Sequence, residues 1–116
     1  MQATWRRGDQ DQMNVKSTTE MVGPAGKVVI LAGRAFITLE DVTAEMVADD
    51  MKIGLATAGI WEIPKEGIAF SQFADVFVTS EGKIGTSGTF IGIAENAVGA
   101  SDVTVMVQFS SLAKAA

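Results

Sequence analysis

The stretch Ile53–Lys65 constrains the fold of this chain more than any other part of it. On either side of Gly59 the side chains alternate in type with a period of two residues, which is the pattern of a half-buried β-strand. Gly59 can adopt a positive φ without steric cost, so it permits a bend or a bulge. We therefore predict a long strand that bends at Gly59 and turns Trp61 and Ile63 onto a different part of the core. Pro64 has no N–H to donate and should end the pairing.

The same strand chemistry recurs along the chain, separated by glycine-containing turns. The segments predicted as further strands are residues 13–19, 27–32, 35–39, 75–79, 83–86, 88–94 and 102–109. The 116 residues suffice for one domain with one modest core. We predict an all-β fold, a small single-domain β-barrel or compact β-sandwich of about 7–9 short strands.

Three segments depart from this pattern. Residues 1–12 are mostly polar and charged, and we predict a flexible N-terminal arm ahead of a β domain at residues 13–110. Residues 111–116 are expected to form a C-terminal tail. Near residues 41–49 the spacing of apolar side chains favours at most one short helix, with Asp41 or Thr43 as its N-terminal cap.

Charge and cysteine content exclude several functional classes. The net charge is −5, whereas proteins that bind nucleic acids non-specifically need clustered Lys and Arg. The chain has no cysteine, so disulfide frameworks and thiolate metal sites are impossible. No segment approaches the roughly 20 apolar residues of a membrane helix, and the N-terminus lacks the apolar stretch of a secretory signal. We expect neither nucleic acid nor membrane as a partner.

The residues required by common catalytic mechanisms are largely missing. The chain has no His, Cys or Tyr, which excludes His-dependent triads and thiol nucleophiles. Acidic residues at 40–50, alone or with Glu62, leave a two-carboxylate hydrolase or a divalent-metal site open, but no motif fixes the spacing that either requires. The glycines before Lys27 do not form a phosphate loop, because Met21 and Val28 occupy its required Gly and Ser/Thr positions. We predict no enzyme, cofactor or metal.

The N-terminal arm contains the best candidate contact residues for a partner. Trp5, Arg6, Arg7 and Asp9 lie together, and Trp and Arg are favoured at the energetic centres of protein interfaces. Two interpretations remain open at this point. The arm is either a frayed tail or a segment that becomes ordered against a partner, with Trp5 as the anchor.

Several motifs of this sequence, and their order along the chain, resemble those of the small capsid cement, or head decoration, proteins of tailed phages. The resemblance covers most of residues 5–109. The segment Gly59–Lys65 is the most distinctive, since relatives tend to have a Gly-Val-Phe-Glu-Leu-Pro-Lys-like sequence there. The matching segments are Trp5-Arg6-Arg7-Gly8-Asp9, Gly23-Pro24-Ala25-Gly26-Lys27-Val28-Val29, Ala58-Gly59-Ile60-Trp61-Glu62-Ile63-Pro64-Lys65, Asp75-Val76-Phe77-Val78, Phe90-Ile91-Gly92-Ile93-Ala94 and Asp102-Val103-Thr104-Val105-Met106-Val107.

The resemblance implies a structural protein, made in the bacterial host cytoplasm, that binds the outer surface of the mature capsid and stabilises the virion. Its implied partners are the phage major capsid protein and further copies of itself. A homotrimer is expected, because capsid lattices offer local threefold positions. Relatives are often labelled predicted phage recombinases, an activity that the failed phosphate loop and the negative charge of this chain argue against.

A second functional class remains open beside the decoration protein. A virion-associated module that binds host glycans, or another partner, without catalysis would use exposed aromatic rings as sugar platforms. Trp5 and Trp61 are the candidate rings. Trp61 lies in an alternating apolar strand, so we predict that it belongs to the core.

Overall fold

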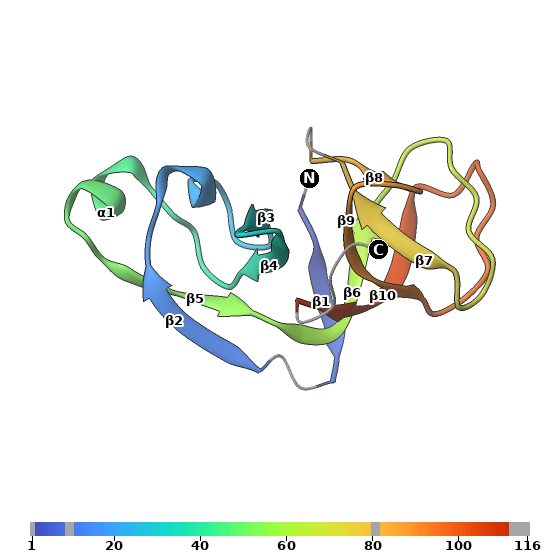
Figure 1. Ribbon diagram of the computed structural model, residues 1–116, viewed down its shortest axis with the longest axis horizontal. Coiled ribbons are helices and arrows are strands. Elements are labelled where there is room, and N and C mark those ends of the chain that lie inside the picture. Colours follow the sequence, from blue (N-terminus) through green and yellow to red (C-terminus); the bar gives the residue numbers. More distant parts are fainter. Residues whose placement is uncertain (1, 9–10, 80–81, 112–116) are drawn as a thin grey trace.

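The computed structural model describes residues 2–8, 11–79 and 82–111, and it confirms an all-β fold with ten strands in two antiparallel sheets. Two short helices, η1 (Thr19–Met21) and α1 (Ala44–Ala48), accompany them (Figure 1). Neither helix in this part of the chain has the length and apolar character to cross a membrane. The strands are β1 (Thr4–Arg7), β2 (Gln12–Lys16), β3 (Val28–Leu31), β4 (Arg34–Thr38), β5 (Lys52–Ala56), β6 (Ala58–Pro64), β7 (Asp75–Val78), β8 (Ile84–Gly85), β9 (Thr89–Ala94) and β10 (Thr104–Ser110).

The two sheets lie next to each other along the longest axis of an elongated molecule of 43 × 26 × 25 Å (Figure 1). The six-stranded sheet has the order β1-β6-β10-β9-β7-β8, and the four-stranded sheet has the order β2-β5-β4-β3. In the described part of the chain β1 and β8 do not pair, so the larger sheet is open. The described strands thus form two separate open sheets rather than one closed barrel.

The two sheets join at Thr57, two residues before the predicted bend at Gly59. β5 ends at Ala56 and belongs to the smaller sheet, whereas β6 begins at Ala58 and belongs to the larger one. Gly59 has a φ of 109°, a conformation that residues with a Cβ rarely adopt. Strands β1 and β2 pair antiparallel with β6 and β5, respectively, and we call these four strands the ribbon.

The ribbon distributes its apolar side chains between two hydrophobic clusters. The larger cluster joins the sheets, with Ala35 and Ile37 of β4 packed with residues of β6, β9 and β10. Trp61, predicted to be a core residue, belongs to this cluster and is 3% exposed. The smaller cluster contains Ile53 and Leu55 and is covered in part by α1. The side chains of β6 therefore pack mainly in the larger cluster, and Ile53 and Leu55 of β5 pack in the smaller one.

The short helix is confirmed at the predicted place. The Met46 N–H donates to Thr43 Oγ1 over 3.2 Å, so Thr43 rather than Asp41 caps α1. The Asp41 carboxylate instead accepts a hydrogen bond from the Ala25 N–H over 2.8 Å. Asp41 thus holds the preceding glycine-rich turn against the start of the helix.

The prediction of a flexible N-terminal arm is corrected for residues 2–8. Residues 4–7 form β1, and the Ala3 N–H donates to the Gly26 carbonyl over 2.7 Å. Ala3 is only 4% exposed. The prediction counted apolar side-chain area, but an edge strand is also stabilised by backbone hydrogen bonds to a strand that is already in place. Of the predicted C-terminal tail, Ser111 is buried and residues 112–116 lie outside the described part.

Candidate functional site

The predicted contact residues lie on the β1 edge of the six-stranded sheet. In this edge Trp5 stands opposite Trp61 of β6, and the register shifts between Trp5 and Arg7. All four residues of β1 are exposed. The structure therefore brings Trp5, Arg6 and Arg7 together on a surface strand, whereas Asp9 lies outside the described residues.

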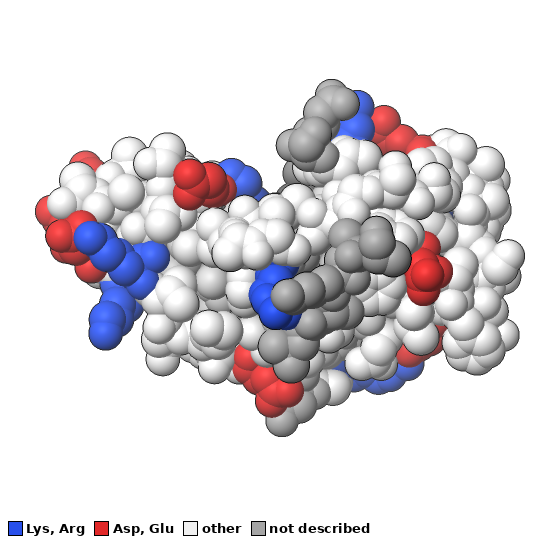
Figure 2. All heavy atoms as spheres, in the orientation of Figure 1, with Lys and Arg blue, Asp and Glu red and all other residues white. Residues whose placement is uncertain are grey.

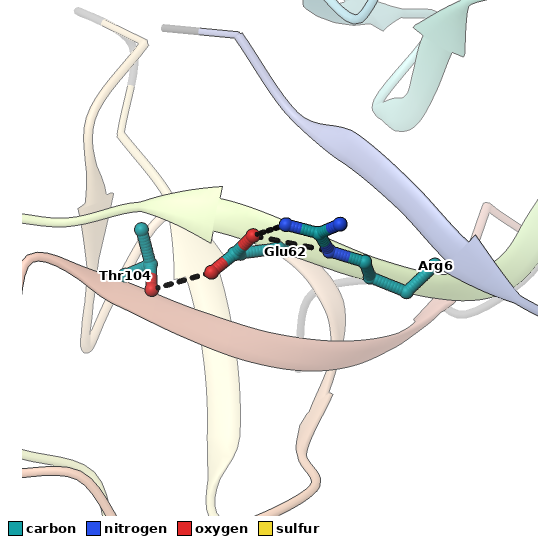
Figure 3. Close-up of polar contacts among 3 residues, drawn as sticks. All are labelled: Arg6, Glu62 and Thr104. Carbon is teal, nitrogen blue, oxygen red and sulfur yellow. Dashed lines mark hydrogen bonds and ion pairs between the residues drawn. The ribbon is translucent and has the colours of Figure 1, made fainter.

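Arg6 is engaged in a polar network across three strands (Figure 3). Its Nε donates to Glu62 Oε1 over 3.1 Å, and its Nη2 forms an ion pair with the same oxygen. Thr104 Oγ1 donates to Glu62 Oε2 over 3.0 Å from β10. The hydrogen bonds from Arg6 and then Thr104 hold the pKa of Glu62 below its usual value. The network fastens β1 to the sheet through side chains as well as backbone.

Arg7 forms a second ion pair, with Glu95 directly after β9. The hydrogen bond from Arg7 to Glu95, together with the attraction between the charges, raises the pKa of the Arg7 guanidinium. Both arginines of the predicted contact set are therefore paired with carboxylates of their own chain. These ion pairs hold the edge strand to the sheet. A partner would have to bind Arg6 and Arg7 while they remain paired with Glu62 and Glu95.

Trp5 has the largest accessible apolar surface of the predicted contact set, with 45% of the residue exposed. Its Nε1–H donates to the Gly8 carbonyl over 3.1 Å. One side of the ring lies over Gly59, because a Cβ built there would come within 3.4 Å of Trp5 Cδ1 and Nε1. The indole is thus fixed on its inner side and accessible on its outer side.

The second candidate sugar platform, Trp61, is excluded by its burial. Its Nε1–H donates to the Ala58 carbonyl over 3.0 Å, so its polar group is satisfied inside the fold. Among the described residues, only Trp5 can present an indole face to a ligand.

The structure does not bring the candidate catalytic carboxylates together. Glu62 lies on β6, whereas the acidic segment 40–50 surrounds α1 in the other lobe (Figure 1). In the described part of the chain no three His, Cys, Asp or Glu side chains are placed to bind a metal ion. The Lys16–Asp50 ion pair, at 3.1 Å, lies in the same lobe as α1. In Figure 2 most of the visible face carries no charge, and charged groups gather at the α1 end of the molecule.

An open depression of about 680 Å³ lies between residues 64–68 on one side and residues 79 and 82–87 on the other. Its buried cation is Lys65, which is 6% exposed. Lys65 Nζ donates to the carbonyls of Gly99 and Asp102 over 2.8 and 2.7 Å. The lysine is therefore occupied in closing the loop before β10.

Sequence reasoning missed the partners that hold the contact residues in place. Glu62, Glu95 and Thr104 become neighbours of β1 only through the order β1-β6-β10-β9. No local pattern marks Glu95 or Thr104, since the pairing joins residues 42 and 88 positions apart. The one available signal was Glu62 itself, a carboxylate at an outward position of an apolar strand.

When the chain is compared with known protein families, with curated protein sequences and with solved structures, nothing matches.

Proposed function

We propose that this protein is a decoration protein that binds the outer surface of a phage capsid and stabilises it. The observation that carries the proposal is the ribbon edge. β1 and β2 are the terminal strands of the two sheets, each pairs through one edge only in the described chain, and together they span both lobes. Such an edge suits contact with a broad protein surface better than capture of a small molecule.

The composition of this edge supports attachment rather than chemistry. β2 presents Gln12, Asn14 and Lys16 with Met13 at 46% exposure, and β1 presents Trp5 beside two ion-paired arginines. Polar groups and isolated apolar anchors of this kind are typical of interfaces that form between separately folded proteins. The motif resemblance to phage decoration proteins points to the same role.

Capsid stabilisation by such a protein follows from mass action. A protein that binds only the expanded form of a shell stabilises that form according to its concentration and affinity. Modest contacts at each site add up over the many equivalent sites of a symmetric lattice. A homotrimer on the local threefold positions is the assembly that we propose, because three copies would then bind as one unit.

The test is co-sedimentation of the purified protein with undecorated capsids of its own phage, in expanded and unexpanded forms. We expect saturable binding to expanded shells at a fixed ratio to the capsid protein. The mass of the free protein, from light scattering, checks the trimer independently. Absence of binding to both forms would overturn the proposal.

A second candidate function is favoured by the exposed face of Trp5. A glycan-binding module would use this ring as its platform, since sugar rings stack on indoles. Titration of intrinsic fluorescence with host-derived glycans would test it, with Trp5→Ala as the matched variant. Deletion of residues 1–12 would not be a clean test of either function, because it removes β1 and uncovers the edge of β6.

A further inference from the structure

The turn at Ser71–Ala74 presents a large apolar side chain outward. Phe73 is 67% exposed, the largest exposure of any aromatic residue in the described chain. Phe70, in the same loop, is 4% exposed and belongs to the larger core cluster. The loop therefore directs one phenylalanine into the protein and the other into solvent.

The backbone at Phe73 is strained. Its φ is 67°, in the left-handed region that bulky residues rarely enter. Three other described residues that are not glycine also have a positive φ, and local chemistry accounts for each of them. Asp11 and Asp50 have short polar side chains that tolerate it, and Ala32 precedes Gly33 in the two-residue turn between β3 and β4. Phe73 has no such explanation.

Hydrogen bonds hold the strained turn in place. The Phe73 N–H donates to the Ala94 carbonyl over 2.8 Å, and the Ala94 N–H donates to the Ala74 carbonyl over 2.9 Å. The Ala74 N–H closes the turn on the Ser71 carbonyl over 3.1 Å. Phe70 and Val98 exchange two further backbone bonds nearby. The aromatic ring is thus presented on a fixed backbone, which lowers the entropy lost when it binds.

Folding does not explain why a phenylalanine stands at this position. The side chain belongs to neither hydrophobic cluster and makes no contact with another aromatic ring of the described chain. Glycine or asparagine would fit the backbone better. A bulky, largely exposed residue on a disfavoured backbone is expected where a binding partner supplies the compensation.

Charge near the turn indicates the chemistry of that partner. Asp75, two residues further along the chain, is exposed and forms no ion pair with any described residue. An apolar anchor followed two residues later by an exposed carboxylate is complementary to an apolar pocket with Lys or Arg at its rim. The net charge of −5 makes an anionic membrane surface an unfavourable alternative.

We infer that Phe73 is a preformed anchor that inserts into an apolar, basic-rimmed pocket on the capsid protein. This inference rests on the proposed function, and it adds a contact point separate from the β1 edge. Asp75 contributes the ion pair at the rim of the pocket.

The deciding variant is Phe73→Asn, which removes the ring and suits the left-handed backbone. We expect its Tm to equal or exceed that of the wild type, and its affinity for expanded capsids to fall about 10-fold or more. Phe73→Tyr should retain most of the affinity. Asp75→Asn should weaken binding about 3-fold and reduce its dependence on salt. Val103→Asn, which removes another exposed apolar side chain, at 73% exposure, is the matched control and should bind normally.

The outcomes separate this inference from the proposed function. Unchanged capsid affinity of Phe73→Asn, with normal binding by the wild type, would overturn the anchor and leave the decoration role intact. A clear fall in the Tm of that variant would also overturn it, since the ring would then have a structural role. Failure of the wild type to bind any capsid would overturn both. If the wild type binds phosphatidylcholine vesicles and Phe73→Asn does not, Phe73 inserts into a membrane rather than into a pocket on the capsid protein.

Discussion

Trp5 and Phe73 are both large exposed aromatic residues, and they differ in what their own chain does with them. The Trp5 indole donates a hydrogen bond to Gly8 and covers Gly59. Phe73 is 67% exposed, forms no ring pair with a described aromatic residue, and lies on a backbone that disfavours it. The first residue therefore has an internal role that accounts for much of its surface, whereas most of the surface of the second faces solvent.

The comparison shows that residue type alone is a weak indicator of a contact site. The Trp-Arg-Arg segment has the composition of an interface, yet Arg6 and Arg7 are engaged with Glu62 and Glu95 of the same sheet. The turn at Phe73 has an unremarkable composition, and only its backbone geometry and its exposure distinguish it. A search for partners should therefore ask which side chains remain unused after folding.

The largest effect is expected from Gly26→Ala, which tests whether the N-terminal segment is part of the fold. The added Cβ would lie 2.2 Å from the Ala3 carbonyl oxygen, so the contact between the N-terminus and this turn must break. We expect a loss of about 3 kcal/mol in the free energy of unfolding, measured by urea denaturation.

Gly33→Ala is the matched control for this substitution. Gly33 also has a positive φ, but a Cβ there meets no atom within 4 Å. Only backbone strain remains, and a loss of about 1 kcal/mol is expected. Equal losses in the two variants would show that the contact of residues 2–3 with this turn does not stabilise the fold. The N-terminal segment would then be a flexible arm after all.

A smaller effect is expected from Trp5→Ala, which sharpens the contrast with Phe73. Loss of the indole removes its hydrogen bond to Gly8 and uncovers Gly59, at a cost of about 1 kcal/mol. Phe73→Ala should cost much less in the same thermal or urea unfolding experiment. A greater loss for Phe73→Ala would mean that its ring does support the fold, and the comparison would be reversed.

The smallest effect concerns the pH dependence of the β1 attachment. The Glu62 pKa lies below its ordinary value of 4.5 in the folded protein, so its contribution to stability is present above that pH. This contribution is lost as the pH falls through the lowered folded pKa. Glu62→Gln should therefore lower the Tm slightly at neutral pH and leave it unchanged at pH values below the lowered pKa of Glu62.

Glu66→Gln is the control for the pH series. Glu66 lies 3.9 Å from Lys83 Nζ, with 83% of its side chain exposed, and surface pairs of this kind contribute little. Its Tm should follow that of the wild type at every pH. A Glu62→Gln curve that also parallels the wild type would show that the Arg6–Glu62–Thr104 network does not hold the edge strand.

Local signals in the sequence predicted the elements of this fold well. Alternation around Gly59 located the junction between the sheets to within two residues, and it predicted the core position of Trp61. Thr43 was one of two predicted caps of α1. These features depend on neighbouring residues, which a single sequence displays directly.

The pairing of β1 with β6 was not predictable in the same way. It joins Trp5 to a residue 56 positions away, and the polar composition of residues 1–12 gave no apolar periodicity. Nor does sequence composition reveal that Phe73 has a positive φ, because turn rules assign that conformation to Gly, Asn or Asp. The unexpected residue was visible only once the backbone was known.

The most direct test of this account is hydroxyl-radical footprinting of the protein, free and bound to expanded capsids. Mass spectrometry would read the oxidation of Phe73 and Trp5, with Met51, 47% exposed, as an internal reference. Phe73 is expected to lose most of its reactivity on binding, by a larger factor than Trp5. Undiminished oxidation of Phe73 in saturated, capsid-bound protein would contradict it.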